Sequence, residues 1–179
     1  MNKKRLLFML TFLMFLMILS GIYYVLVRNV KLKDAELYEI TSVINGYDYK
    51  YLLNEEFDDV RDINIMNVLN NRSFYENEPV VEETYLVSAD KVSLYLKKYT
   101  GLSISEFNNP ITDELDMTNN MFTHVFYDTE TYYRFDCLKG TYRKNRYNLT
   151  CARDGKLYNV VLNKSKNVYK VVSFVSSSK

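Results

Sequence analysis

The two cysteines are the residues of this chain whose spacing most clearly predicts a bond. Cys137 and Cys151 lie on the two arms of an expected hairpin centred near Lys144, which places them directly opposite one another. Cross-strand neighbours lie about 4.5–5.5 Å apart at Cα, a distance that a disulfide can bridge. The spacing therefore predicts a disulfide in an exported protein, and two buried thiols in a reducing compartment are the alternative. With one histidine and two cysteines in the chain, no zinc or other metal site is expected.

His124 is the only histidine, so a Ser-His or Cys-His nucleophilic enzyme would have to use it. It lies in an expected strand, and no nucleophile elbow, phosphate-binding loop or zinc-protease motif accompanies it. A structural histidine is therefore favoured over a catalytic one. No cofactor is expected either.

The densest acidic cluster of the chain comprises Glu55, Glu56, Asp58, Asp59 and Asp62. It lacks the alternating spacing and the central glycine of a calcium-binding loop. A pair of carboxylates serves glycoside hydrolysis only at a suitable separation in space, which spacing along the chain does not give. We interpret the cluster as a solvated loop that leads into a helix.

Basic side chains are concentrated on the hairpin that holds the cysteines. The set comprises Arg134, Lys139, Arg143, Lys144, Arg146, Arg153 and Lys156, interleaved with Tyr132, Tyr133, Tyr142 and Tyr147. Such a surface suits a polyanion, either an anionic wall polymer or a lipid headgroup. Nucleic acid is not expected, because the compartment inferred below is the wrong one. The alternative is that these charges only keep exposed strands soluble and block edge pairing.

The compartment follows from an apolar segment near the N-terminus. Leu6 to Val27 are 22 residues without a charge, and as a helix they span about 33 Å, enough for the roughly 30 Å hydrocarbon layer. Residues 1–5 form a basic cytoplasmic n-region, and Tyr23 and Tyr24 suit the opposite headgroup region. The sequence thus predicts a retained, single-pass signal-anchor in the plasma membrane.

A cleaved signal peptide is the alternative for this segment. It is disfavoured because the apolar run exceeds the usual core of about 7–15 residues, and because Ile18 or Leu19 would occupy the position of a small residue. Charge does not fix the orientation, since residues 3–5 and residues 28–33 each carry three basic residues. We expect the N-terminus inside and the following domain outside the cell.

Helical periodicity describes most of residues 28–82, which we interpret as a helical stalk and helical subregion. Residues 83–179 are expected to form an α+β domain, and helical periodicity also describes its first part. A strand is expected over residues 83–87. Helices are expected over residues 33–44, 58–70 and 89–99, the last capped by Ser88, and a capping box is expected at Ser103 and Glu106.

The last third of the chain alternates with the period of strands. Residues 146–153 and 156–162 flank Asp154-Gly155, the strongest hairpin signal in the chain, which sets Leu149 opposite Val160. Two further pairings are expected: residues 120–127 with 132–138, and residues 168–175 with the preceding strand, so that Leu162 faces Tyr169 and Val160 faces Val171. The fold class is α+β, an N-terminal transmembrane helix followed by helices packed on an antiparallel β-meander.

From Val87 onward the order of motifs resembles that of a known class of protein. The capped helix SADKVSLYLKKYTGLSISEF, a Tyr-rich hairpin, DGKLYNVVL and VYKVVSFVSS together resemble uncharacterised membrane-anchored envelope proteins of Gram-positive bacteria, and more loosely the nuclear-transport-factor-2-like class. The resemblance covers about half the chain. It implies an α+β fold and no particular activity, because that class contains enzymes, scaffolds and secretion components.

The sequence as a whole predicts a non-enzymatic, membrane-anchored extracytoplasmic protein that binds an envelope polymer or a protein partner. Its composition, with 47% hydrophobic and 25% charged residues, excludes a disordered chain. One alternative is an envelope-acting hydrolase that uses His124 or an acidic pair. The other is a subunit of a larger membrane assembly.

Overall fold

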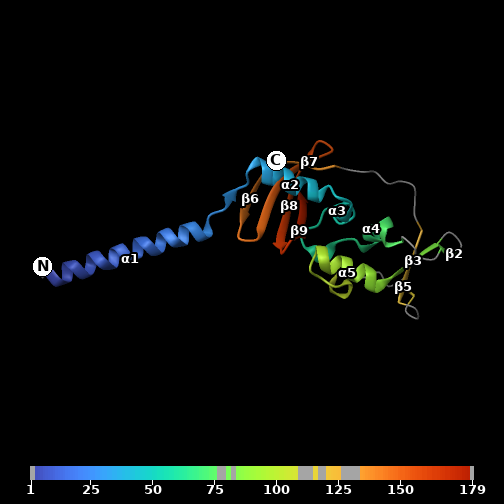
Figure 1. The fold of residues 1–179 in the computed structure, drawn as a ribbon, viewed down its shortest axis with the longest axis horizontal. Coiled ribbons are helices and arrows are strands. Elements are labelled where there is room, and N and C mark those ends of the chain that lie inside the picture. Colours follow the sequence, from blue (N-terminus) through green and yellow to red (C-terminus); the bar gives the residue numbers. More distant parts are fainter. Residues whose placement is uncertain are drawn as a thin grey trace. The chain divides into compact units, whose positions relative to one another are not determined.

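The structure, a computed structural model, describes residues 3–75, 80–81, 84–108, 115–116, 120–125 and 134–177. The chain divides into two compact units, Met1–Val30 and Lys31–Lys179 (Figure 1). The stretch from residue 31 to residue 82, expected as a helical subregion, belongs to the same unit as the strands that follow it.

The first unit consists mainly of one long helix, α1 (Lys3–Val27). Its described side chains are those of residues 9–25, and the large apolar ones among them are 44% to 73% exposed. They occur on all sides of the helix rather than along one stripe, so α1 has no polar face to turn toward water. Within the residues that the structure describes, no helix is both long enough and apolar enough to cross a membrane.

The second unit contains four α-helices and three 3-10 turns among its described residues. They are α2 (Asp34–Ile44), α3 (Tyr47–Lys50), η1 (Val60–Asp62), α4 (Ile65–Leu69), η2 (Arg72–Phe74), α5 (Ala89–Tyr99) and η3 (Ile104–Glu106). The helices predicted at residues 33–44 and 89–99 are confirmed as α2 and α5. The Ser88 hydroxyl accepts the backbone N–H of Asp90 and so satisfies a donor in the first turn of α5.

The single helix predicted over residues 58–70 is wrong, because two side chains interrupt it. Asp59 accepts the backbone N–H of Arg61 and so caps the start of η1. Asn64 accepts the backbone N–H of Met66 and so caps the start of α4. Short Asp and Asn side chains compete in this way with the helical backbone, so one amphipathic run becomes two short turns.

The strands form two antiparallel sheets. The five-stranded sheet has the order β1-β6-β7-β8-β9, and the four-stranded sheet has the order β2-β3-β5-β4. Their bounds are β1 (Val30–Lys31), β2 (Val80–Val81), β3 (Thr84–Ser88), β4 (Leu115–Asp116), β5 (Met121–His124), β6 (Asp136–Arg143), β7 (Arg146–Arg153), β8 (Lys156–Ser165) and β9 (Val168–Ser176). Strands β6 to β9 are consecutive along the chain, so the predicted antiparallel meander is confirmed.

The pairing predicted between residues 120–127 and 132–138 is wrong within the described residues. Strand β5 pairs with β3 and with β4, so both of its edges are occupied. Strand β6 lies between β1 and β7 in the other sheet. The two segments are neighbours along the chain but belong to different sheets, which local alternation in the sequence does not reveal.

The register of the meander agrees with the prediction at one hairpin and differs at the next. Leu149 faces Val160 across the Asp154-Gly155 turn, as predicted. Leu162, however, faces Val171 rather than Tyr169, because the turn lies one residue later, at Lys166-Asn167. A shift of two positions keeps the same side chains on the core face.

A bulge in β9 changes that face once more. Val161 pairs with Ser173 and Leu162 pairs with Val171, so Val172 is the extra residue. The extra residue turns Phe174 onto the core face, where it is fully buried and pairs with Val160. The alternation of the sequence, taken without the bulge, places Phe174 on the opposite face.

The core lies between this sheet and the helices that precede it. Helix α2 packs against β6, where Gly140 leaves room for it. A Cβ at Gly140 would lie 2.5 Å from Cδ1 of Leu32 and 3.3 Å from Cδ1 of Leu37. The contact fixes the direction of α2, which runs antiparallel to β6: Leu37 lies over Gly140, while Asn45 bonds to the backbone of Phe135.

Candidate functional site

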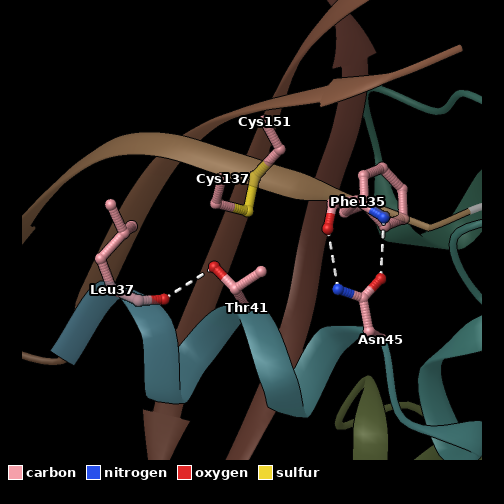
Figure 2. The surroundings of a disulfide bond; sticks show 6 residues. All are labelled: Leu37, Thr41, Asn45, Phe135, Cys137 and Cys151. Carbon is pink, nitrogen blue, oxygen red and sulfur yellow. Dashed lines mark hydrogen bonds between the residues drawn. A yellow bond between two sulfur atoms is a disulfide. The ribbon is translucent and has the colours of Figure 1, made fainter. Parts of the chain in front are cut away.

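The disulfide predicted between Cys137 and Cys151 is present. The two residues face each other across β6 and β7, with the sulfurs bonded and the Cα atoms 3.8 Å apart. Figure 2 shows the bond between α2 and the strands, on the side of the helix that carries Thr41. Both cysteines are buried, so the bond is part of the core and fixes the hairpin on which most of the basic residues lie.

The predicted pairing of the cysteines is correct, but the position of the hairpin turn differs from the prediction and a bulge compensates for the difference. The turn lies at Lys144-Asn145, with Arg143 facing Arg146, and without an irregularity this register would set Cys137 opposite Ala152. A bulge between Cys137 and Lys139 removes that one-residue offset. The bulge residue, Leu138, is left 56% exposed.

His124 is a buried residue of β5. It is 6% exposed, its ring is stacked on the ring of Tyr75 at 6.0 Å between centroids, and its Nε2 lies 2.9 Å from Oδ1 of Asn70. Burial lowers the pKa of His124, because the charged form loses its hydration. These two contacts are with the side-chain amide of Asn70 and the phenol ring of Tyr75. They support the structural interpretation of His124.

Several carboxylates of the acidic cluster accept hydrogen bonds from other parts of the fold. Glu56 accepts the backbone N–H of Ser176 at 2.6 Å, and Asp62 accepts the side-chain amide of Asn108 at 2.7 Å. The Arg61 guanidinium beside Asp59 lowers the pKa of that carboxyl to about 2. Among the described residues, no group of His, Cys, Asp and Glu is arranged to hold a metal ion. Asp59 therefore caps its own turn, while Glu56 and Asp62 join this segment to β9 and to Asn108.

Six of the seven predicted basic residues lie toward opposite ends of the sheet, and the seventh, Lys139, lies between them on β6. Arg143, Lys144 and Arg146 lie together at the β6–β7 turn, and all three are exposed. The rings of Tyr142 and Tyr147 stack beside them at 5.8 Å between centroids.

The remaining predicted cations lie away from that turn. Arg134 precedes β6, while Arg153 and Lys156 flank the β7–β8 turn at the far end of the strands. Lys139 lies between the two groups on β6. Tyr132 and Tyr133 lie outside the described residues.

Arg153 differs from the others because the fold uses its charge. Its guanidinium donates to the backbone oxygens of Leu53 at 2.7 Å and Asn54 at 3.2 Å. It also lies 4.9 to 5.2 Å from the centroids of three aromatic rings, those of Phe135, Tyr158 and Phe174. Arg153 thus joins the sheet to a segment 100 residues earlier, a role that is structural by its contacts.

Sequence reasoning missed four cations that lie at the same end as the first group. The β8–β9 turn lies beside the β6–β7 turn, because the backbone N–H of Lys164 donates to the oxygen of Asn145 at 2.7 Å. This places Lys164 and Lys166 beside Arg143 and its neighbours. The start of α2 brings Lys31 and Lys33 to the same end, since Leu32 bonds to Gly140 and α2 runs from there toward Phe135.

We call this surface the basic end; it comprises Lys31, Lys33, Arg143, Lys144, Arg146, Lys164 and Lys166. Six of these side chains are exposed, and Lys164 is half-buried. The Lys164 ammonium donates to the Tyr169 hydroxyl at 3.1 Å, which raises the pKa of Lys164 and keeps it charged. The basic end therefore presents fixed positive charge on three separate parts of the chain, which suits an anionic partner with several charges.

A shallow cavity of about 550 Å³ lies on α2 and α3. Tyr38, Glu39, Ser42, Val43, Gly46, Asp48 and Tyr49 line it. The Tyr99 hydroxyl donates a hydrogen bond to the Asp48 carboxylate. Burial raises the pKa of Tyr99, and the hydrogen bond to Asp48 raises it further. The lining combines aromatic rings with the carboxylates of Glu39 and Asp48.

Comparison with protein families, with curated proteins and with solved structures finds no match to this chain. The resemblance to Gram-positive envelope proteins and to the nuclear-transport-factor-2-like class therefore stays a prediction.

Proposed function

We propose that the protein is a single-pass membrane protein that holds a non-enzymatic binding domain outside the cell. The observation that carries the proposal is the surface of α1. Its described apolar side chains are exposed on every side, and the uncharged run extends in the sequence from Leu6 to Val27. A helix that is apolar all round is stable in lipid or inside a larger core.

The disulfide supports the outward orientation. Cys137 and Cys151 are joined in the core of the second unit, and structural disulfides persist in oxidising compartments rather than in the cytosol. The proposed activity is binding, which agrees with the hydrogen bonds that join His124 to Asn70 and Asp62 to Asn108. The proposed partner is an anionic component of the envelope, bound at the basic end.

The proposal is tested by extracting membranes at alkaline pH and by treating intact cells with protease. We expect the full chain to resist alkaline extraction and its second unit to be cleaved in intact cells. Release into the soluble fraction would contradict the anchor. Protection of the second unit in intact cells, with cleavage only after lysis, would contradict the outward orientation.

A further inference from the structure

The chemistry of the basic end and its place along the chain point to one particular partner. The basic end has seven basic side chains. The neighbouring turns of α2 contribute three acidic residues, Asp34, Glu36 and Glu39. Glu36 accepts the backbone N–H of Lys33 at 3.1 Å, and Glu39 acts on Lys164 electrostatically. The acids therefore offset part of the charge, and a net positive surface remains.

The length of the chain limits how far this surface lies from the anchor. Lys31 follows Val27, the last residue of the uncharged run, by four residues. Four residues span at most about 14 Å when fully extended. The basic end is the end of the second unit at which Lys31 lies, so a bilayer that holds α1 is within reach of it.

We infer that the basic end docks on the anionic headgroups of the same bilayer that holds α1. The inference rests on the proposed function, since it needs the anchor. Juxtamembrane Lys and Arg residues gain about 1 kcal/mol each near an anionic lipid surface, and the gain falls off within a Debye length of about 8–10 Å. The short segment after Val27 keeps the basic end close to the bilayer that holds α1, whereas nothing keeps it close to a wall polymer. The short segment therefore favours lipid as the partner.

The test uses the full chain in lipid nanodiscs and a single fluorescent label. Because both native cysteines are in the disulfide, an introduced thiol is the only one that reacts. Asn167→Cys places the label in the β8–β9 turn of the basic end, and Asp136→Cys places it at the far end of β6. The discs contain either phosphatidylcholine alone or a mixture with phosphatidylglycerol, each with a headgroup-nitroxide lipid as quencher.

Two charge variants are compared, each lacking three exposed cations. The test variant is Lys144→Gln, Arg146→Gln and Lys166→Gln; the matched control is Arg134→Gln, Lys139→Gln and Lys156→Gln. At about 1 kcal/mol for each cation, the test variant should lower the ratio of docked to undocked protein roughly 100-fold. The control should leave it unchanged.

The expected result is quenching at residue 167 in discs with phosphatidylglycerol. This quenching should disappear in phosphatidylcholine discs, at high salt and in the test variant. The label at residue 136 should stay unquenched. Equal quenching in both lipids, or equal loss in the control variant, would overturn the inference. A third result would also overturn the inference: a soluble polyphosphate polymer shields the label at residue 167, while anionic lipid produces no quenching. The partner would then be a polymer.

The two proposals fail in distinguishable ways. A chain that does not co-elute with the discs lacks the anchor, which overturns the proposed function and the lipid inference together. A chain that co-elutes but shows no dependence on lipid charge keeps its anchor and overturns the lipid inference alone.

Discussion

Replacing Gly140 with alanine tests how α2 is held on the sheet that carries the basic end. An added Cβ would lie 2.5 Å from Cδ1 of Leu32 and 2.8 Å from Cδ2 of Leu149. Both leucines are buried, at 4% and 1% exposure, so neither can turn its side chain into solvent. Overpacking of this kind costs about 1–3 kcal/mol. The loss of glycine's extra freedom in the unfolded chain returns roughly 0.5–1 kcal/mol.

Gly140→Ala should therefore lower the free energy of unfolding by about 1–2 kcal/mol. For a chain of this size each kcal/mol corresponds to a shift in Tm of about 2–4 °C. Tyrosine fluorescence during urea unfolding in detergent is a suitable assay, because the chain has 17 Tyr and no Trp. Gly21→Ala is the matched control, since a Cβ there meets nothing within 4 Å.

A double-mutant cycle with Leu32→Ala separates the clash from other effects. Removing the Leu32 side chain makes room for the new Cβ, so the double variant should be more stable than the sum of the single changes predicts, by about 1 kcal/mol. A Gly140→Ala variant as stable as the parent would refute the reasoning. Strict additivity in the cycle would show that Leu32 is not the obstacle.

Three other changes give further tests. Cys137→Ser should lower stability by about 2–4 kcal/mol, mostly through the unfolded chain, and peptide mapping of the parent without reductant should recover one linked fragment; two alkylatable thiols in protein taken directly from cells would contradict the bond. Arg153→Met should cost about 2–4 kcal/mol in urea unfolding without changing lipid dependence, because its bonds to the backbone oxygens of Leu53 and Asn54 are charge-assisted; unchanged stability would exclude its structural role. His124→Gln should flatten the pH dependence of stability: the pKa of His124 is lowered, so stability is present above the unfolded value of 6.5 and is lost as pH falls from there toward the folded pKa. Equal slopes for parent and variant, measured by unfolding above and below pH 6.5, would show that His124 titrates normally.

Local signals predicted the parts of the fold that local chemistry determines. The Asp154-Gly155 turn has φ values of 51° and 73°, which Asp and Gly tolerate, and the hairpin around it has the predicted register. Helix α5 begins at its predicted cap for the same kind of reason.

The errors lie where packing at a distance decides. The bulges at Leu138 and Val172 leave no clear mark in the alternation, because an extra residue is accepted only when the core face then fits. The edges of β5 are taken by strands before it in the sequence, which no hairpin signal encodes.

The candidate site shows the same division. Arg143, Lys144 and Arg146 were predicted together because one hairpin turn holds them. Lys33 and Lys166 reach the same end only through the packing of α2 and the neighbouring turn, and this requires the tertiary structure. Arg153 has the charge that an anionic ligand needs, but its guanidinium donates to the backbone oxygens of Leu53 and Asn54. These partners lie about 100 residues away along the chain, so the sequence alone does not reveal them.

The most direct test of the membrane-anchored account is the intact mass of the protein recovered from purified membranes of cells that make it. The anchor is retained in this account, so the measured mass should include residues 6–27, and the protein should be found with the membranes. A mature form that begins near Gly21 or Ile22 and is released from the membranes would contradict the account.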